Sequence, residues 1–315
     1  ATGQVTDEAT VTVAGEGTYT IDQATGKVTF KPEPGFTGTA NGVTVSVTAP
    51  VGRDKDGNVP ADALKTATAK YTPTVTPITL TPTNKVSEDV QNVPQTQTPT
   101  FELSNDKTAE ITSKKLVDPA TGQPTDATTV TVAGEGSYTI DPTTGSVTFV
   151  PEKDFVGTAK GVTVQATATI KNEDGKTTTI TADATYTPTV VPAVPTAQPA
   201  KSIDVQGATQ KGKPTFEGTT VTVNGEQKPV TIKENSYTLV DKDGNEVTST
   251  PAYAEDGTTV IGTHTIDPTT GEVTFTPTDK SYSGKVTPVS VQAESSNGIK
   301  VSTTYTPEIV PVTQT

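Results

Sequence analysis

The sequence predicts an all-β chain of tandem β-sandwich-like domains arranged end to end as a rod. Two observations predict this fold class: apolar residues alternate with polar ones, and long phrases recur at a spacing typical of small β-domains. Alternation with a period of two places one face of a strand in a core and the other face in water. Threonine and valine, both abundant here, favour such half-buried pleated surfaces.

The strongest feature is a repeat that occurs in three copies. Residues 11–30 read VTVAGEGTYTIDQATGKVTF, residues 130–149 read VTVAGEGSYTIDPTTGSVTF, and residues 262–275 read GTHTIDPTTGEVTF. Each copy closes on the phrase Tyr-Thr-Pro, at Tyr71, Tyr186 and Tyr305, and these tyrosines lie 115 and 119 residues apart. A period this long indicates a whole domain per copy, because the turns of a solenoid repeat at much shorter intervals.

The second and third copies also share a front half that precedes these phrases. Pro99-Thr-Phe101 corresponds to Pro214-Thr-Phe216, and Asp89-Val-Gln91 corresponds to Asp204-Val-Gln206. The first copy has no such segment, because its ATGQVT at residues 1–6 aligns with ATGQPT at residues 120–125. We therefore expect the chain to begin inside a repeat of a longer protein.

Proline clusters follow the first two closing phrases and predict the domain boundaries. They read TPTVTPITLTP at residues 72–82 and TPTVVPAVPTAQP at residues 187–199. Proline fixes its own φ and pushes the preceding residue to extended geometry, so we expect short, semi-rigid linkers here. The expected domains cover residues 1–77 (an N-terminally truncated copy), 78–193 and 194–315.

Each copy contains one well-defined hairpin turn. Asp141 is expected to bond its own backbone, Pro142 to preset φ, and Gly145 to supply the left-handed residue that closes the loop. Tyr138 and Ile140 on one side of the turn, with Val147 and Phe149 on the other, are expected to face the core. The same turn is expected at Asp22 and Gly26 and at Asp267 and Gly271.

Two further recurring units follow the hairpin. The aromatic residue of Pro-x-x-x-aromatic-x-Gly is expected to plug the core; its examples are Phe36, Phe155 and, with one extra residue, Tyr282. Next comes a strand with one buried face, carried by Val43, Val45 and Val47 in the first copy and by Val162, Val164 and Ala166 in the second.

Charge and composition exclude several classes of protein. The 36 acidic and 23 basic residues leave a net charge of −13, which disfavours nucleic acid and anionic membranes as partners. The absence of cysteine excludes thiol catalysis, disulfides and cysteine-ligated zinc. No apolar stretch is long enough to span a membrane, so we expect no membrane insertion. A signal peptide and a sorting motif are expected elsewhere in the parent protein.

No catalytic, cofactor-binding or metal-binding residue is predicted, and we expect the protein not to be an enzyme. The only histidine, His264, stands where the other copies have Tyr19 and Tyr138, whereas a catalytic residue would recur in every copy. With one histidine and no cysteine, neither a Ser/His triad nor a typical zinc site is expected. His264 is therefore interpreted as structural.

Two other motifs favour turns over binding sites. The runs Asp54-Lys-Asp-Gly-Asn58 and Asp241-Lys-Asp-Gly-Asn245 resemble part of a calcium loop, but neither has a glutamate at the twelfth position. Ordinary turns are favoured there, and adventitious calcium remains the alternative. Ala-Gly-Glu-Gly at residues 14–17 and 133–136 opens no helix, so a tight turn is expected instead of a phosphate cradle. Isopeptide or ester cross-links between side chains stay open.

Together these phrases resemble the CshA-type fibril repeat of cell-wall-anchored adhesins from Gram-positive bacteria. The resemblance rests on TYTIDPTTGxVTFxP, the aromatic-x-Gly that follows it, the valine-rich strand and the closing Tyr-Thr-Pro, and it covers nearly the whole chain. The third copy departs from the pattern by insertions at residues 222–236 and 280–283, and it lacks Ala-Gly-Glu-Gly.

The resemblance implies a secreted stalk segment that projects an adhesive region from the cell wall, to which it is anchored through a region outside this chain. The expected partners are adjacent repeats of the same chain, and host extracellular-matrix or salivary proteins bound through other regions of the parent protein. The alternative is that the repeats themselves bind a host matrix protein, a glycan or a neighbouring fibril. Loops that vary between copies, such as residues 50–62 and 171–177, are expected to carry that binding.

Overall fold

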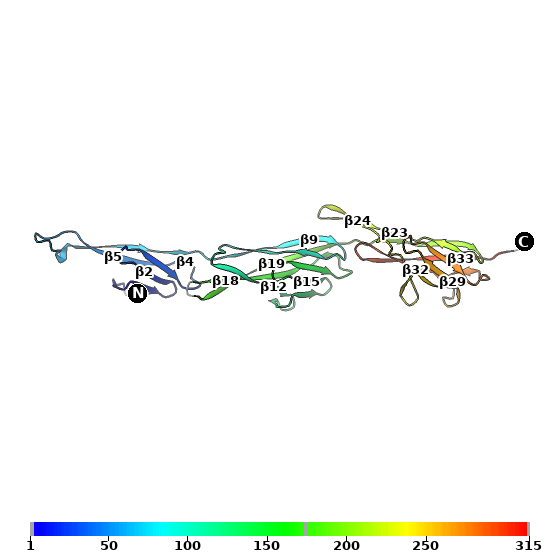
Figure 1. Ribbon diagram of the computed structural model, residues 1–315, viewed down its shortest axis with the longest axis horizontal. Helices are drawn as coiled ribbons and strands as arrows, with labels where there is room; N and C mark the ends of the chain where they lie inside the picture. Colours follow the sequence, from blue (N-terminus) through cyan, green and yellow to red (C-terminus); the bar gives the residue numbers. More distant parts are fainter. Residues whose placement is uncertain (1–2, 173–174, 314–315) are drawn as a thin grey trace. The chain divides into compact units, whose positions relative to one another are not determined.

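The computed structural model describes residues 3–172 and 175–313, and nearly all of its regular structure is β-strand (Figure 1). No α-helix occurs in these ranges, and the one helical segment is the short 3-10 turn Ala61–Ala63. The predicted all-β fold class is therefore confirmed. No helix among the described residues is long and apolar enough to cross a membrane.

The described chain divides into two compact units. The first unit contains Ala1–Pro82, Thr100–Lys114 and Gln165–Asp183, and the second contains Thr83–Pro99, Lys115–Val164 and Ala184–Thr315. The second unit thus includes the whole third copy together with parts of the second. The division into domains at residues 1–77, 78–193 and 194–315 stays a prediction.

The second copy is a β-sandwich. One sheet has the strand order β13-β12-β18-β19-β17, with β9 paired in parallel to β19, and the other has the order β10-β16-β15-β14; β8 and β11 form a separate pair. The strands are β8 (Leu80–Thr83), β9 (Lys85–Val90), β10 (Gln95–Gln97), β11 (Thr100–Leu103), β12 (Ala109–Asp118), β13 (Gln123–Pro124), β14 (Thr129–Val132), β15 (Gly136–Ile140), β16 (Val147–Pro151), β17 (Gly157–Thr158), β18 (Val162–Lys171) and β19 (Thr177–Val191).

The third copy repeats this plan and adds one hairpin, β24-β25. Its sheets have the orders β21-β33-β32-β26-β27, with β31 paired to β33, and β22-β30-β29-β28, while β20 pairs with β23. The strands are β20 (Thr196–Gln198), β21 (Ala200–Val205), β22 (Gln210–Gly212), β23 (Thr215–Glu217), β24 (Thr219–Val223), β25 (Glu226–Val230), β26 (Thr238–Val240), β27 (Glu246–Val247), β28 (Ser249–Tyr253), β29 (Val260–Ile266), β30 (Val273–Pro277), β31 (Gly284–Lys285), β32 (Val289–Glu294) and β33 (Lys300–Val310).

The described residues of the first copy form strands equivalent to the back half of this plan. Its strands form the sheet β1-β2-β3 and the pairs β4-β7 and β5-β6. They are β1 (Thr10–Val13), β2 (Gly17–Ile21), β3 (Val28–Pro32), β4 (Gly38–Thr39), β5 (Val43–Pro50), β6 (Leu64–Tyr71) and β7 (Thr74–Val75).

An aromatic cluster joins the two sheets of each copy. In the second copy the ring of Tyr138 lies 4.8 Å from that of Phe149 on the same sheet and 6.3 Å, edge to face, from that of Tyr186 on the facing sheet. All three side chains are fully buried. The same cluster is formed by Tyr19, Phe30 and Tyr71 in the first copy and by His264, Phe275 and Tyr305 in the third. The repeated phrases therefore carry the contacts that hold the sheets together.

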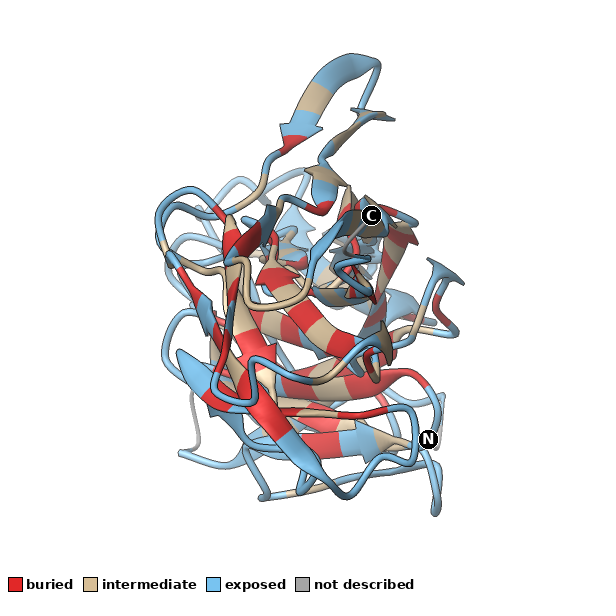
Figure 2. Ribbon diagram, turned by 90° about the vertical axis from the view of Figure 1, so that its right-hand side faces the viewer, coloured by how far each residue is buried: buried red, intermediate tan, exposed pale blue. Residues whose placement is uncertain are grey.

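The predicted hairpin turn is confirmed in all three copies. In the second copy the Asp141 carboxylate accepts hydrogen bonds from the backbone N–H of Thr143 and Thr144, and Gly145 has a φ of 80°. Ile140 pairs with Val147 across the turn, and both are buried. Asp22 with Gly26 and Asp267 with Gly271 form the same turn. Buried and exposed residues alternate along many of these strands (Figure 2).

Two expectations are corrected. The proline-rich segments are strands over much of their length, since β19 runs through Pro188 to Val191 and β20 and β8 lie within the other stretches. Proline suits such places because they are extended positions where its missing N–H is not needed.

The predicted core plugs Phe36, Phe155 and Tyr282 are only half-buried, and the ring of Phe155 packs edge-on against Phe149 from the rim of the core.

Substituting Gly136 tests the close packing of the two hairpin strands. A Cβ at Gly136 would lie 2.2 Å from the carbonyl oxygen of Val150. The φ of Gly136, 155°, also disfavours any residue with a side chain. We expect Gly136→Ala to lower the free energy of unfolding by more than ~2 kcal/mol. Gly134→Ala is the matched control, because its φ is also positive but its Cβ would meet no atom within 4 Å. Urea unfolding measures both, and an equal loss for the two variants would contradict the packing argument.

Candidate repeat junction

His264 is a core residue of the third copy. Its side chain is 1% exposed, and its ring lies 5.5 Å from that of Phe275 and 6.0 Å from that of Tyr305. Neither ring nitrogen has a hydrogen-bond partner in the described part of the chain. Burial lowers the pKa of His264 to about 4, so the ring is neutral at pH 7. The structure thus supports the structural interpretation of this residue.

The two acidic runs form turns. The Asp54 carboxylate accepts hydrogen bonds from the backbone N–H of Asp56 and Asn58, both at 2.9 Å. Asp241 does the same with the N–H groups of Asp243 and Asn245, and the hydrogen bond from Asn245 lowers the pKa of Asp241. In each run the first aspartate carboxylate therefore accepts hydrogen bonds from the backbone of its own turn. Across the described ranges no three or more acidic or histidine side chains gather closely enough to hold a metal ion.

The Ala-Gly-Glu-Gly phrase forms the expected tight turn, but its glutamate has a role that the sequence analysis missed. Glu135 is 7% exposed, and its Oε1 accepts a hydrogen bond of 2.8 Å from the backbone N–H of Lys160. Glu16 makes the same bond to Asn41, at 2.6 Å, and this bond lowers the pKa of Glu16. The glutamate thus ties its turn to the loop before β5 or β18. The recurrence of this glutamate in two copies was the sequence signal that could have indicated its role.

The extra hairpin of the third copy packs against the end of the second copy. Val223 and Val230, at the ends of β24 and β25, form an apolar cluster with Val90 of β9 and Ala193. All four are buried. These residues belong to one compact unit, the second. The hairpin, residues 219–230, overlaps the insertion at residues 222–236, so the departure of this copy from the repeat pattern supplies the apolar contact.

Asn297, in the turn between β32 and β33, is the polar centre of this junction. Its side chain is 4% exposed, and its Nδ2 donates to the carbonyl oxygens of Gln91, at 3.0 Å, and Ala193, at 2.9 Å. Its own carbonyl oxygen accepts a hydrogen bond of 2.8 Å from Nδ2 of Asn92. Its Oδ1 accepts a hydrogen bond from Ser295. The side-chain amide is therefore fully hydrogen-bonded. Asn297 makes three hydrogen bonds to the second copy, two through this amide and one through its backbone carbonyl.

Charged groups surround the junction at its edge. Lys228 of β25 forms a salt bridge with Asp89 of β9. The backbone N–H of Asn224, at the tip of the β24-β25 hairpin, donates to Oε2 of Glu88 at 2.7 Å. Because the Lys228 and Asp89 side chains are partly exposed, their ion pair adds little free energy and serves mainly to set the orientation of the hairpin.

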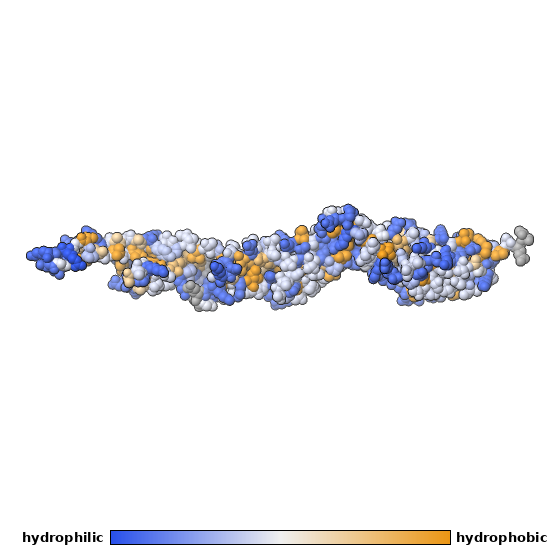
Figure 3. All heavy atoms as spheres, turned by 45° about the horizontal axis from the view of Figure 1, so that its top comes forward, coloured by the Kyte–Doolittle hydropathy of each residue, from blue (hydrophilic) through white to orange (hydrophobic). Residues whose placement is uncertain are grey.

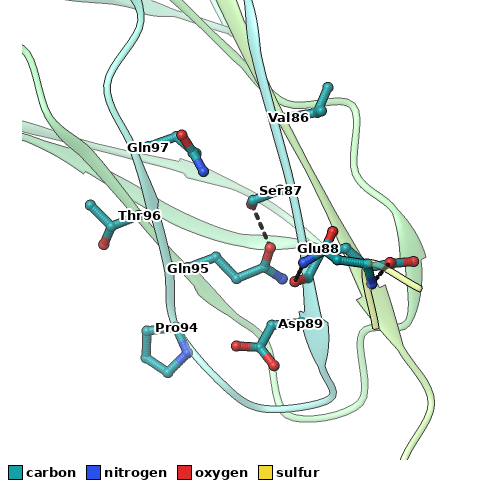
Figure 4. Close-up of a pocket in the computed structure, with 9 residues that line it drawn as sticks. Val86, Ser87, Glu88, Asp89, Pro94, Gln95, Thr96 and Gln97 are labelled. Carbon is teal, nitrogen blue, oxygen red and sulfur yellow. Dashed lines mark hydrogen bonds between the residues drawn. The ribbon is translucent and has the colours of Figure 1, made fainter. Parts of the chain in front are cut away.

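An open polar pocket of about 290 Å³ lies beside these contacts (Figure 4). It is lined by Val86, Ser87, Glu88, Asp89, Pro94, Gln95, Thr96, Gln97 and Asn224. Inside it, the Ser87 hydroxyl donates to Oε1 of Gln95 at 2.5 Å, as Figure 4 shows. Glu88 and Asp89 are engaged by the hairpin, so the pocket is part of the junction.

The chain was compared with known proteins. The family model described as "Surface adhesin CshA repetitive domain" matches residues 1–75, 77–190 and 192–309. No curated protein matches the chain.

Solved structures give weaker likenesses. The structure of mouse cadherin-23 EC22-24 is similar at 11% identity with a TM-score of 0.30, covering 95% of this chain and 83% of that one. The N-terminal Ig1-2 module of the Drosophila receptor protein tyrosine phosphatase DLAR is similar at 14% identity with a TM-score of 0.21, covering 74% and 99%. Likenesses of this size do not bear on what the chain does.

Asn297→Ala tests the junction. The substitution leaves two buried carbonyl oxygens, those of Gln91 and Ala193, without their donor, which costs roughly 1–3 kcal/mol for each buried group. We expect amide hydrogen exchange in residues 219–230 to quicken at least tenfold, while β15 and β16 stay protected. Asn245→Ala, in an exposed turn of the same copy, is the control. Unchanged exchange in the hairpin would show that Asn297 does not hold the junction.

A pH titration tests the burial of His264. With the folded pKa near 4 and the unfolded pKa near 6.5, the unfolded chain takes up the proton first as the pH falls. The stability of the third copy should therefore decrease between about pH 6.5 and pH 4, by about 3 kcal/mol in total, and then level off. His264→Phe should remove this component of the pH dependence in urea unfolding. A titration midpoint near 6.5 for the single histidine in NMR would contradict the assignment.

Proposed function

Because the chain belongs to the repetitive-domain family of the CshA surface adhesin, as its three matched segments show, we propose that it is a non-catalytic stalk segment. Its repeats would project an adhesive region from the cell wall of a Gram-positive bacterium. Membership of a surface-adhesin family implies an extracellular surface location. Anchoring to the wall, adhesion of whole cells and a role in biofilm or virulence belong to the proposal.

The junction between the second and third copies is the observation that carries this proposal. A stalk must resist bending, and adjacent repeats joined only by a flexible tether would not. Here the contact consists of a buried asparagine whose side-chain amide is fully hydrogen-bonded, an apolar cluster, and an ion pair at the edge. These features favour one preferred arrangement of neighbouring copies, which makes adjacent repeats of the same chain the proposed partners.

The continuity of the backbone supports the same role. In the second copy β19 leads directly through Val191 to Ala193, which is itself 1% exposed and part of the junction cluster. A strand of ten residues, such as β18, spans ~33 Å. If copies follow one another end to end as a rod, the reach of the stalk increases in proportion to their number.

The alternative, that the repeats themselves bind a host matrix protein, a glycan or a neighbouring fibril, stays a prediction. Its proposed loops are residues 50–62 and 171–177, of which residues 173 and 174 lie outside the described residues. Saturable binding of this chain to matrix proteins, abolished by replacing one of those loops, would favour the alternative. Equal binding after replacement would count against it.

A spin-label distance measurement tests the stalk proposal. The chain has no cysteine, so Thr131→Cys and Thr265→Cys, both exposed, give two unique labels in the second and third copies. We expect a single narrow distance distribution, which Asn297→Ala should broaden at least twofold because it removes both side-chain hydrogen bonds to the second copy.

Small-angle scattering of the unlabelled chain is the second measurement, with a maximum dimension of ~100 Å or more expected for three copies in line. A compact globule, or a distribution already broad without Asn297→Ala, would rule out a stiff stalk.

A further inference from the structure

In the second and third copies a strand near the start of the copy pairs in parallel with the closing strand. Residues 85–90 of β9 lie beside residues 186–191 of β19, in six residue pairs. Residues 200–205 of β21 lie beside residues 305–310 of β33, again in six pairs. Each parallel pair therefore joins the two ends of its own copy directly.

A hydrogen-bond network fastens the parallel pair of the third copy to the facing sheet. The Tyr305 hydroxyl of β33 lies 2.7 Å from Oγ of Ser202 on β21, and Ser202 donates to Oε1 of Gln210 on the facing sheet at 2.6 Å. Since the serine hydrogen is used in that bond, Tyr305 donates to Ser202. Nε2 of Gln210 donates to the carbonyl oxygen of Glu308 in β33 at 3.0 Å. Both strands of the pair are thus bonded to one buried glutamine.

The second copy makes the same network with its own residues. The tyrosine hydroxyl lies 2.7 Å from the serine Oγ, the serine donates to the glutamine at 2.5 Å, and the glutamine donates to the closing strand at 2.9 Å. These residues are Tyr186, Ser87, Gln95 and Thr189. Because both copies contain it, the network belongs to the repeat itself and is independent of the junction between them.

A second glutamine holds the other end of each parallel pair. The backbone N–H of Gln206, directly after β21, donates to the carbonyl oxygen of Val310 at 3.0 Å. Its side-chain Oε1 accepts a hydrogen bond of 2.9 Å from the backbone N–H of Val312. Gln91 makes the equivalent two bonds in the second copy. Side chains therefore reinforce the backbone pairing at both of its ends.

The outward side chains near the start of β9 and β21 are exposed. Val86 of β9 is 72% exposed, and Lys201, at the equivalent position of β21, is exposed as well. On the face that it draws, Figure 3 shows apolar atoms in small groups separated by hydrophilic or neutral ones. Backbone pairing and the inward network therefore hold this part of each strand, because little packing covers its outer side.

Parallel pairing of these strands decides how a pulling force acts on a copy. When two parallel strands are pulled from opposite ends they slide past each other, so the evenly spaced bonds between them are loaded together and must break together. When the strands are pulled apart from one end, the same bonds break one after another. Tension that reaches a copy through β21 and leaves it through β33 acts in the first way.

We propose that each parallel pair, together with its tyrosine, serine and glutamine network, is a mechanical clamp that lets the copy withstand tension along the chain without unfolding. Sliding of β21 along β33 breaks the bond between Tyr305 and Ser202 together with the backbone bonds, which raises the barrier to unfolding under load. The clamp does not depend on the stalk role, because it lies within each copy.

Single-molecule pulling of the full chain in two directions tests the clamp. The chain has no cysteine, so two introduced cysteines at exposed positions give unique handles. Lys201→Cys with Val312→Cys pulls β21 and β33 from opposite ends, whereas Lys201→Cys with Thr304→Cys pulls them at the same end. We expect the first rupture to need at least twice the force in the opposite-end arrangement, because its bonds break together. Handles within β21 also exclude the shorter pair β20-β23 from the loaded path.

Tyr305→Phe tests the network, because it keeps the buried ring and removes the hydroxyl that bonds Ser202. At a fixed force in the opposite-end arrangement, we expect this variant to unfold at least tenfold faster. Tyr237→Phe is the matched control, because Tyr237 lies in the same copy and among the described residues its hydroxyl bonds neither β21 nor β33.

Equal rupture forces in the two directions would overturn the clamp, and so would equal unfolding rates of the two tyrosine variants under load. A compact chain in small-angle scattering would count against the stalk and leave the clamp standing, so the two proposals fail on different measurements.

Discussion

The closing tyrosine is the residue on which each complete repeat depends. Its ring packs edge-on against the aromatic residue of the facing sheet, and its hydroxyl bonds the serine of the front half. One side chain thus joins the two sheets and attaches the parallel strand that completes one of them. Cores this poor in large apolar side chains, in a chain with only 5% aromatic residues, rely on such a shared contact, because few other side chains bury comparable area.

The three copies show what happens when members of this cluster change. In the third copy a histidine replaces the first tyrosine, and it stays neutral in the core because charging it there would cost solvation energy. In the first copy, where the described residues include no strand paired in parallel beside the closing tyrosine, that tyrosine is 37% exposed. The cluster therefore tolerates a change of ring, and the closing tyrosine is fully buried in the two copies where such a strand lies beside it.

Contact between copies uses a different set of residues from the core within each copy. The hairpin β24-β25 is specific to the third copy, whereas Gln91 of the second copy has its counterpart in Gln206. Val90 is buried in the cluster that Val223 and Val230 of the hairpin complete. The apolar part of this junction is thus supplied by a segment that the repeated phrases do not include.

Local sequence was sufficient to predict the β-strands, the Asp-to-Gly hairpin turns and the buried faces around Tyr138 and Phe149, because these depend on side-chain alternation and on φ preferences of a few residues. The family resemblance followed from the same phrases. Tertiary structure alone decided the roles of Glu135 and Asn297, since each acts through backbone groups distant in sequence that no local pattern specifies. It also decided that the proline-rich stretches are largely paired strands, because extended geometry suits a linker and a strand equally until a partner strand lies beside it.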